Sequence, residues 1–497
     1  MQDDLDVTVH PARNLNVDQS HDLDPDDLIY RLQADDIDLT SGTTVELPPG
    51  TYTIPTTLQG SVDNWTLRGT GDSPQDVRLI TRGQNKRLIE IHGGSNIRVE
   101  NLTIHNGTDG EHAVGIRIDG TGGILTKDIH HTGLSPREGN TGNHEQFNRQ
   151  ENSLYITVSQ SDGVAITDGF VKKSPTEVSG HAENDPIFTA YASHRGIWYV
   201  RNSVAMHAGG DGATYASRTR GGIRFTNCVF KNNYASSIRL GGGQSWVRNC
   251  TVICDHQQAT GIDLLSPTAT HMSPIVWEAG GVYEGARSRT GGLIENTRVE
   301  LRSVPAGQTR GCIGIDGSSG GIIVRNCQLI NSTDSPSVAV DAPGSSFMND
   351  YQIPAEPHGV YLENLQLSGD GTGPAIAASG RQVLAQGICI SMPNGGAVRG
   401  ARFLDSGPQR SSCSFVSTPD RPALYQQLLS LQQGVPTAGQ GIGATGFEIP
   451  GLSNLIDGIS TVVIMAATLL LVFGLLIIGF IVLISAGGIF AVKRLVS

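Results

Sequence analysis

The chain has 497 residues, of which 63 are glycine, and only 5% of its residues are aromatic. This much glycine without a Gly-x-y period excludes a collagen-like chain and is typical of a β protein dense in turns. The net charge is -12, and no basic run occurs before the far C-terminus. These two features argue against nucleic acid as a partner.

The N-terminal part is acidic, and we assign residues 1–37 to an acidic segment that ends in a capping helix. The stretch DPDDLIYRLQAD (residues 24–35) begins with aspartates and places Leu28, Ile29 and Leu32 on one helical face. A helix here would cover the exposed end of the repeats that follow. The first residues have neither the basic start nor the apolar stretch of a secretory signal.

A short phrase then recurs along the chain: an alternating apolar strand, an asparagine, and a second run of β-forming residues. Neighbouring copies at Asn202, Asn227 and Asn249 lie about 22 to 25 residues apart, which is within the range of solenoid repeats. A segment this short cannot bury its own apolar face and needs copies above and below it. The asparagines that mark the phrase are Asn101, Asn202, Asn227, Asn249, Asn296, Asn326 and Asn364.

These phrases resemble the coils of the pectate-lyase-like β-helix superfamily, in which asparagines stack as a ladder at one turn. TTVELPPGTYTIPTTLQGSVDNWTLRGT (residues 43–70) resembles the opening coil of such proteins, with its PPGTY turn. The resemblance implies an all-β fold, a right-handed parallel β-helix over residues 38–415. Because the superfamily includes lyases, hydrolases, epimerases, viral tailspikes and adhesins, the resemblance does not by itself fix an activity.

Two further columns are expected from the repeat. The residue before each ladder asparagine alternates in charge, so opposite charges should pair between neighbouring rungs on the solvent side. Cys228, Cys250 and Cys327 each follow a ladder asparagine and should face inward, either as buried thiols or with a Cys228–Cys250 bridge. The charged residues are Glu100, Arg201, Arg248, Glu295, Arg325 and Glu363.

The repeat pattern loosens between residues 128 and 194, where long polar excursions separate recognisable strands. Loops on a rigid stack are where such a scaffold carries binding chemistry. Histidines and carboxylates here could serve acid–base cleavage of a uronic-acid polymer. The sequence shows neither the family lyases' pattern of calcium-binding aspartates followed by an arginine pair nor the adjacent-aspartate pattern of the pectin hydrolases. The alternative is that these loops only solvate the stack or contact a partner. The catalytic candidates are His130, His131, Arg137, Glu138, His194, Arg195, His207 and Asp211.

Ligand-binding candidates come from aspartates that end strands and from aromatic residues in a later excursion. If the aspartates share a face, they could bind Ca²⁺ or a sugar hydroxyl; the alternative is that each only starts a turn. No Cys/His cluster has zinc-ligand spacing, so the metal is unknown and Ca²⁺ is the only cofactor suggested. The candidates are Asp119, Asp263, Asp316, Asp341, Trp277 and Tyr283.

The C-terminal part is predicted to leave the stack and enter a membrane. Residues 416–457 read as a capping helix (DRPALYQQLLSLQQ) and a Gly/Pro-rich stalk. Residues 458–492 contain no charge and exceed the roughly 20 apolar residues that span a bilayer. The basic tail 493–497 would stay in the cytoplasm with the β-helix outside; the alternative is tail-first insertion with the domain in the cytoplasm.

Together these features predict a single-pass membrane protein whose surface β-helix recognises glycans or polysaccharide and could process them. Its partners would be the lipid bilayer, through residues 458–492, and polysaccharide or glycoprotein glycans. A homotrimer is one expected assembly. Two alternatives remain: a polysaccharide lyase or glycoside hydrolase acting on uronate-containing polymers, and a viral spike or adhesin that binds a host surface.

Overall fold

The structure is a computed structural model. It describes residues 29–31, 37–54, 57–81, 88–105, 115–133, 153–173, 186–208, 212–258, 272–278, 290–304, 309–344, 356–410 and 421–431. The chain divides into two compact units, Met1–Pro436 and Thr437–Ser497. All described residues belong to the first unit, so residues 437–497, including the apolar segment 458–492, lie outside the description.

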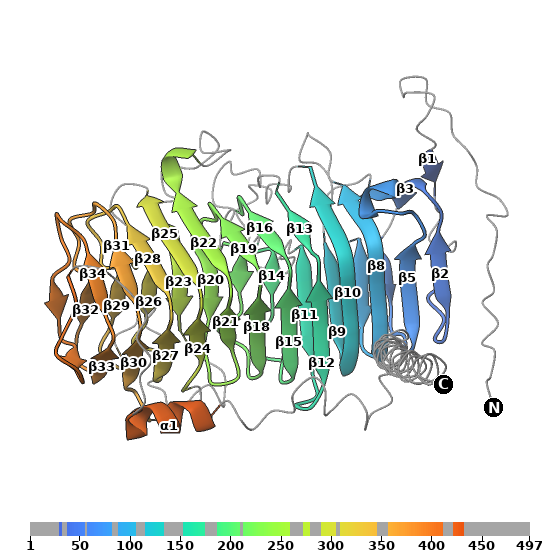
Figure 1. Cartoon of the computed structure of the whole chain (residues 1–497). Coiled ribbons are helices and arrows are strands. Elements are labelled where there is room, and N and C mark those ends of the chain that lie inside the picture. The colour runs from blue at the N-terminus through green and yellow to red at the C-terminus, as the bar shows by residue number, and fades with distance from the viewer. Residues whose placement is uncertain are drawn as a thin grey trace, which may run out of the picture. The chain divides into compact units, whose positions relative to one another are not determined.

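The described residues form a parallel β-helix whose rungs have three faces (Figure 1). One rung shows the plan: β15 (Ile197–Arg201) lies on face I, β16 (Val204–Met206) on face II and β17 (Thr214–Tyr215) on face III, before β18 (Gly222–Thr226) returns to face I. Every strand pairing is parallel, because each strand lies on its counterpart in the next rung. The stacked parallel strands fit the right-handed β-helix that the sequence predicts.

Faces I and II form one 24-stranded sheet that bends at a turn in every rung. Besides β15 and β18, face I contains β2 (Thr44–Leu47), β5 (Trp65–Gly69), β12 (Val164–Asp168), β21 (Trp246–Arg248), β24 (Leu293–Glu295), β27 (Ile322–Arg325), β30 (Val360–Glu363), β33 (Val383–Gln386) and β36 (Arg402–Phe403). Two long strands, β8 (Ser95–His105) and β10 (Gly122–Thr132), run through the turn into face II.

Besides β16, face II contains β1 (Ile29–Arg31), β3 (Gly50–Ile54), β6 (Val77–Thr81), β13 (Val171–Lys172), β19 (Val229–Lys231), β22 (Thr251–Asp255), β25 (Arg298–Ser303), β28 (Gln328–Asn331), β31 (Gln366–Ser368) and β34 (Cys389–Ser391). Two 3-10 turns, η1 (Pro74–Asp76) and η3 (His256–Gln258), lie between strands.

Face III consists of two six-stranded sheets in succession along the stack. The first contains β17 with β4 (Leu58–Gly60), β7 (Ile89–His92), β9 (Ile116–Gly120), β11 (Leu154–Val158) and β14 (Phe188–Thr189). The second contains β20 (Ala235–Leu240), β23 (Met272–Trp277), β26 (Ile313–Ile315), β29 (Val338–Val340), β32 (Ile376–Ala378) and β35 (Val398–Arg399).

The asparagine ladder lies at the turn between faces I and II, as predicted. All seven ladder asparagines have φ between 50° and 56°, a left-handed conformation that Asn tolerates better than most residues. Their amides link rungs: Asn227 Nδ2 donates to Asn202 Oδ1 at 3.3 Å, and Asn364 Nδ2 to Asn326 Oδ1 at 3.2 Å. The repeated sequence phrase therefore marks the left-handed turn between faces I and II in each of these rungs.

Directly before this corner, face I carries an alternating column of charge, also as predicted. Arg201 pairs with Asp168 at 2.9 Å, while Glu295 lies between Arg248 at 2.6 Å and Arg325 at 2.5 Å. Each pair joins neighbouring strands in register, so an out-of-register stack would bring like charges together. In stacking order the column is Glu46, Arg68, Glu100, Lys127, Asp168, Arg201, Thr226, Arg248, Glu295, Arg325, Glu363 and Gln386.

The interior is a continuous apolar core. Large rings fill its middle rungs, where Phe188 contacts Phe225 with centroids 5.7 Å apart and Trp198 at 6.0 Å. Five cysteines are free and buried, including Cys228, Cys250 and Cys327, so the thiol alternative is confirmed over the Cys228–Cys250 bridge. Cys389 in the last rung is disulfide-bonded.

The prediction of an N-terminal capping helix is wrong for those residues of the segment that the structure describes. Residues Ile29–Arg31 form strand β1, which pairs in parallel with β3. The free edge of β3 offers backbone donors and acceptors, and pairing with them outweighs the weak helical pattern of a short segment.

The C-terminal helix exists as α1 (Ala423–Ser430), but it does not cover the end of the stack. It lies along face I beside β27, β30 and β33 (Figure 1). Leu424, Tyr425 and Leu428 of α1 pack on an outward-facing apolar row of that face, formed by Leu293, Ile323, Tyr361 and Leu384. Among the described residues, no helix is long and apolar enough to cross a membrane.

Candidate functional site

The outer surface of face III carries a row of tyrosines between arginines. Tyr155 on β11 follows Arg117 on β9 in register, and Tyr215 on β17 lies two strands further along. Tyr191, two residues after β14, fills the gap between the two tyrosines. We name Arg117, Tyr155, Tyr191, Tyr215 and Arg239 the face III strip.

The members of the strip touch one another along the stack. The ring centroids of Tyr155 and Tyr191 are 5.6 Å apart, and those of Tyr191 and Tyr215 are 5.5 Å apart. The Arg117 guanidinium lies 4.7 Å from the Tyr155 ring and that of Arg239 lies 4.8 Å from the Tyr215 ring. Cations over aromatic faces are mutually stabilising. The strip is therefore a packed ladder along the axis of the stack, in which Tyr155, Tyr215 and Arg239 are buried and Arg117 and Tyr191 are partly exposed.

A cluster of titratable groups adjoins the strip at Arg117. His92 Nδ1 lies 3.6 Å from Asp119 Oδ2, and His92 Nε2 lies 3.9 Å from Glu90 Oε2. Arg117 Nε lies 2.5 Å from Asp119 Oδ2, and Arg117 Nη1 is 3.6 Å from Glu90 Oε1. The His92 side chain is 40% exposed. This cluster brings a histidine, two carboxylates and an arginine together at an accessible position on two neighbouring strands.

At the other end of the strip, the charges are buried and paired. Arg239 Nε lies 2.6 Å from Glu278 Oε1, and both side chains are nearly inaccessible. Asp316 on the following rung is also buried, and burial raises its pKa, with the nearby Glu278 charge acting in the same direction. Arg310 opposes this shift and bridges Asp316 at 3.3 Å and Asp341 at 2.6 Å. Because these charges are buried and paired with one another, we assign this network a role in stabilising the fold and not in binding a ligand.

The long excursions predicted between strands fall between a face II strand and the face III strand that follows it. Residues 134–152 connect β10 to β11, residues 174–185 connect β13 to β14, and residues 259–271 connect β22 to β23. Each connection runs from face II to face III. These segments lie outside the described residues, and so do the candidates Arg137, Glu138, Asp211, Asp263 and Tyr283.

The four described histidine candidates do not form one constellation. His131 is buried inside the stack, with Nδ1 2.7 Å from Ser153 Oγ, and burial lowers its pKa well below the usual value. His194 is also buried: its Nδ1 accepts from the Val158 N–H at 3.1 Å, and its Nε2 lies 3.2 Å from the Gly222 carbonyl. Both rings therefore satisfy polar groups within the stack.

The other two histidines and Arg195 lie at different edges. His130 is on face II, with Nδ1 2.7 Å from Gln75 Nε2, and partial burial lowers its pKa. His207 occupies a left-handed position, φ 58°, after β16; burial, with the charges of Lys231 and Lys172, lowers its pKa to about 4. Arg195 is exposed at the turn between faces III and I.

The predicted column of aspartates on one face is confirmed for three of its four members. Asp119, Asp316 and Asp341 all end or follow face III strands, but Arg117 binds the first and Arg310 binds the other two. Because a cation already neutralises each carboxylate, the described aspartates do not fit a Ca²⁺ site. No group of three or more His, Cys, Asp or Glu among the described residues could hold a metal. Trp277 is fully buried and donates to the Gly291 carbonyl at 3.3 Å, so it belongs to the core.

Sequence reasoning missed His92, Glu90, Arg117 and the three tyrosines. Their signal is the alternation within face III strands, as in IEIH (residues 89–92) and IRID (residues 116–119), where every second residue is polar and faces out. The repeated asparagine phrase marks only the corner between faces I and II. It therefore does not show how face III strands align between rungs.

The sequence matches no protein-family model and no curated protein. Among solved structures, it is similar to the A-module of mannuronan C-5 epimerase AlgE6 of Azotobacter vinelandii, with 13% identity, 76% of this chain and 92% of that chain covered, and a TM-score of 0.38. A mannuronic-acid-specific family 6 polysaccharide lyase from human gut microbiota has 13% identity, coverages of 80% and 90%, and a TM-score of 0.34.

A third similar structure is the catalytic unit of an α-1,3-glucanase from Streptomyces thermodiastaticus, with 12% identity, coverages of 79% and 69%, and a TM-score of 0.27. At these scores the likenesses carry no argument about activity. The assignment of the β-helix rests on the parallel strand pairing of this chain.

Proposed function

We propose that this protein recognises glycans through the face III strip. The observation that carries the proposal is the run of three tyrosines between arginines on face III, in which Arg117 and Tyr191 are partly exposed and Tyr155 and Tyr215 are packed beside them. Aromatic faces stack on the apolar faces of sugar rings, and guanidinium groups bind carboxylates or hydroxyls. Successive rungs lie about 4.8 Å apart, a spacing comparable to one pyranose unit, so an extended glycan along the axis would meet one rung per sugar.

We further propose that the β-helix is displayed at a cell or virion surface and is anchored by residues 458–492. The uncharged length of that segment and the basic tail that follows it support this proposal. The disulfide at Cys389 gives independent support, because such bonds persist in oxidising compartments outside the cytoplasm. Protease accessibility on intact cells tests the topology: cleavage of the β-helix from outside is expected, and complete protection contradicts it.

The His92 cluster favours a second function, cleavage of uronate-containing polymers as a lyase or hydrolase. Arg117 would neutralise a sugar carboxylate, while His92 beside Asp119 would transfer the proton. A spike or adhesin that binds host glycans without cleaving them would use the same strip and differ only in lacking turnover.

Binding and cleavage are separated with the full chain in detergent micelles. We expect the protein to bind uronate oligosaccharides and to lose affinity in Arg117→Ala, while Lys231→Ala on face II leaves affinity unchanged. Equal binding by all three proteins contradicts the proposed site. New unsaturated or reducing ends that disappear in His92→Ala indicate the enzyme; retained binding without new ends indicates recognition alone. Adding Ca²⁺ in parallel tests the cofactor that the sequence alone suggested.

A further inference from the structure

Five asparagines of the chain begin the pattern Asn-x-Ser/Thr, with a residue other than proline in the middle. This pattern is the acceptor sequence for N-linked oligosaccharides in proteins that face the outside of the cell. The five are Asn64, Asn101, Asn106, Asn249 and Asn331. Asn106 lies outside the described residues. The other four differ in what the fold asks of their side-chain amides.

Two of these asparagines use their amide nitrogens within the fold. Asn101 Nδ2 donates to two carbonyls, that of Gly69 at 3.0 Å and that of Gly71 at 2.8 Å. Asn331 is fully buried, and its Nδ2 donates to the Ser335 carbonyl at 2.7 Å. A sugar on either nitrogen would replace a hydrogen that the fold uses, and at Asn331 it would also have to enter the core. Both changes cost stability.

Asn64 has the opposite arrangement. It is exposed at the turn between β4 on face III and β5 on face I. Its Oδ1 accepts from Asn96 Nδ2 at 2.9 Å, while its own Nδ2 has no hydrogen-bond partner in the described part of the chain. An N-linked sugar attaches at Nδ2, so the bond from Asn96 would survive the modification. Room exists beside this turn, because a Cβ at Gly42 on the neighbouring rung would meet no atom within 4 Å.

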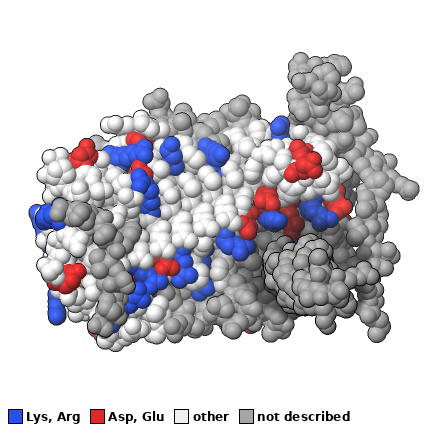
Figure 2. Space-filling model, viewed as in Figure 1, with Lys and Arg blue, Asp and Glu red and all other residues white. Residues whose placement is uncertain are grey.

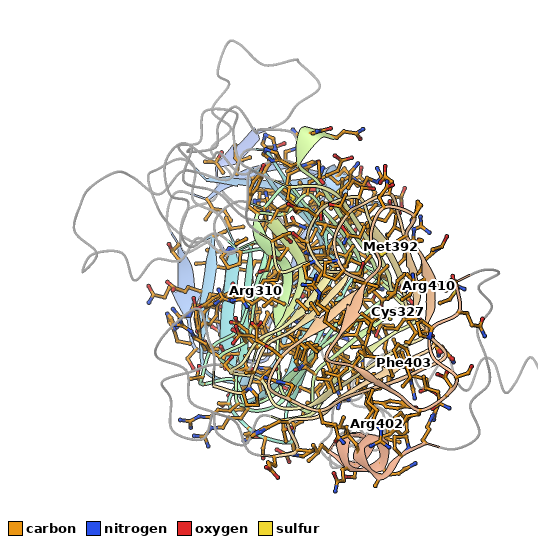
Figure 3. All side chains as sticks on the ribbon, turned by 90° about the vertical axis from the view of Figure 1, so that its left-hand side faces the viewer. Arg310, Cys327, Met392, Arg402, Phe403 and Arg410 are labelled. Atoms are coloured by element: carbon orange, nitrogen blue, oxygen red, sulfur yellow. The ribbon has the colours of Figure 1, made fainter. Side chains whose placement is uncertain are left out.

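Asn249 is exposed on the asparagine ladder, at the turn between faces I and II. The ladder asparagines of the two neighbouring rungs are exposed as well, and none of the described residues hydrogen-bonds to the Asn249 side-chain amide. Cys250, the middle residue of this acceptor sequence, is buried, so Asn249 and Thr251 on either side of it face outward. Figure 3 looks onto the last rungs and labels Cys327, which lies two rungs beyond Cys250 in the same inward-facing column.

We propose that Asn64 and Asn249 are acceptor sites for an N-linked oligosaccharide, and that the folded protein leaves Asn101 and Asn331 unmodified. This modification rests on the proposed display of the β-helix outside the cytoplasm, where the transfer takes place. The amide nitrogen bonds to the anomeric carbon of an oligosaccharide carried on a lipid phosphate. The bond between that carbon and the phosphate oxygen breaks, the lipid phosphate leaves, and the amide loses one proton to a basic group of the oligosaccharyltransferase.

The two sites leave the face III strip unmodified. Asn64 and Asn249 lie at the two turns that border face I, and neither lies on a face III strand. Oligosaccharides at these turns would place hydrophilic bulk beside face I and would not be attached to the strip. Face III would therefore stay available for the glycan binding proposed above.

Peptide mass spectrometry of the purified full chain tests this proposal. The chain is produced in a eukaryotic cell line with a cleavable secretory signal placed before its first residue, so that the result does not depend on how the natural chain reaches the membrane. Enzymatic removal of N-linked glycans in heavy-oxygen water converts each modified asparagine to a labelled aspartate. We expect the label at Asn64 and Asn249 in most molecules, and none at Asn101 and Asn331.

Variants of the two threonines provide matched controls. Thr66→Ala and Thr251→Ala each destroy one acceptor sequence without changing its asparagine, and each should remove one glycan on an electrophoretic gel. Thr66→Ser and Thr251→Ser keep the acceptor sequence and should keep the glycan, with circular dichroism confirming that every variant is folded.

Absence of the label at Asn64 or Asn249, or its presence at Asn101 or Asn331 in the folded protein, overturns the proposal. Protease accessibility is measured on the chain without the added signal, so a cytoplasmic β-helix would overturn the proposed display while the acceptor sites are judged from the label. Uronate binding is measured separately, so loss of the label with retained binding leaves the face III proposal intact.

Discussion

Faces I and III of the same stack use their outward-facing charges differently. On face I, acids and bases of neighbouring rungs neutralise one another, and an apolar row beside them is covered by α1, which Figure 1 shows alongside the stack. On the side of the molecule that Figure 2 shows, blue and red side chains lie in small mixed groups between white areas. On the N-terminal half of face III, arginines stack on tyrosines and a half-exposed histidine lies between two carboxylates. The comparison teaches that charges matched between neighbouring strands specify register on face I, whereas on face III His92 and Arg117 keep part of their side-chain surface exposed.

The largest effect is expected where α1 covers face I. Leu428 is fully buried against this face, so Leu428→Ala should lower the free energy of unfolding by about 3 kcal/mol. Urea denaturation measures the change, and exposed Gln426→Ala serves as control. Uronate affinity should stay unchanged while the protein is folded. A loss of affinity in folded Leu428→Ala would show that face I takes part in binding.

A smaller effect concerns pH at the edge that leads into face III. The pKa of His207 is lowered to about 4 in the folded state, against about 6.5 when unfolded. The unfolded chain thus binds more protons, so stability present above pH 6.5 is lost as pH falls towards 4. Discounting for partial exposure, the loss is about 1–2 kcal/mol. His207→Asn, which tolerates the left-handed backbone, should flatten this dependence in urea denaturation between pH 4 and 7; an unchanged slope would assign the acid sensitivity elsewhere.

The third prediction sharpens the contrast between two tyrosines. Tyr191→Ala should weaken uronate binding about tenfold, since it removes the central ring of the face III strip. Tyr199→Ala removes a ring from the outside of face I, where it contacts Arg224 and Trp246. It should lower stability but leave affinity unchanged. Isothermal titration calorimetry distinguishes the two, and equal losses would erase the proposed difference between the faces.

The smallest effect is expected in the charge column. Glu295→Gln removes the partner of both Arg248 and Arg325 and should cost about 1 kcal/mol or less. The cost should shrink in 1 M salt, as measured by the urea midpoint. Glu100→Gln, whose carboxylate is 3.3 Å from Arg98 on the same strand, is the matched control and should cost less. A salt-independent loss would mean that packing rather than charge holds this column.

The corner asparagines and the alternating charges could be predicted because both repeat within one short phrase. Asn227 and Arg248 carry their structural role in their local sequence. The positions of β1 and α1 could not be predicted, because each depends on a surface that exists only after the rungs have stacked. Leu424 and Leu428 have an ordinary amphipathic pattern, and nothing in it indicates that they would lie along face I rather than over an end.

Only part of the candidate site could be predicted from the sequence. Asp119, which the sequence suggested as a ligand-binding residue, is part of the observed cluster, whereas the excursions at residues 134–152 and 174–185 lie outside the described residues. His131 and His194 were chosen because histidines suit acid–base chemistry, yet both side chains are buried within the stack. His92 was missed because its partners, Asp119 and Arg117, come from the next face III strand and meet it only through inter-strand register.

Hydrogen–deuterium exchange of the full chain, with and without uronate oligosaccharides, tests the central claim most directly. The account predicts slower amide exchange on glycan addition in peptides that contain β9, β11, β14 and β17 of face III. Peptides that contain β21, β24 and β27 of face I should exchange unchanged. Protection confined to face I, or an equal response of both faces, would contradict the account.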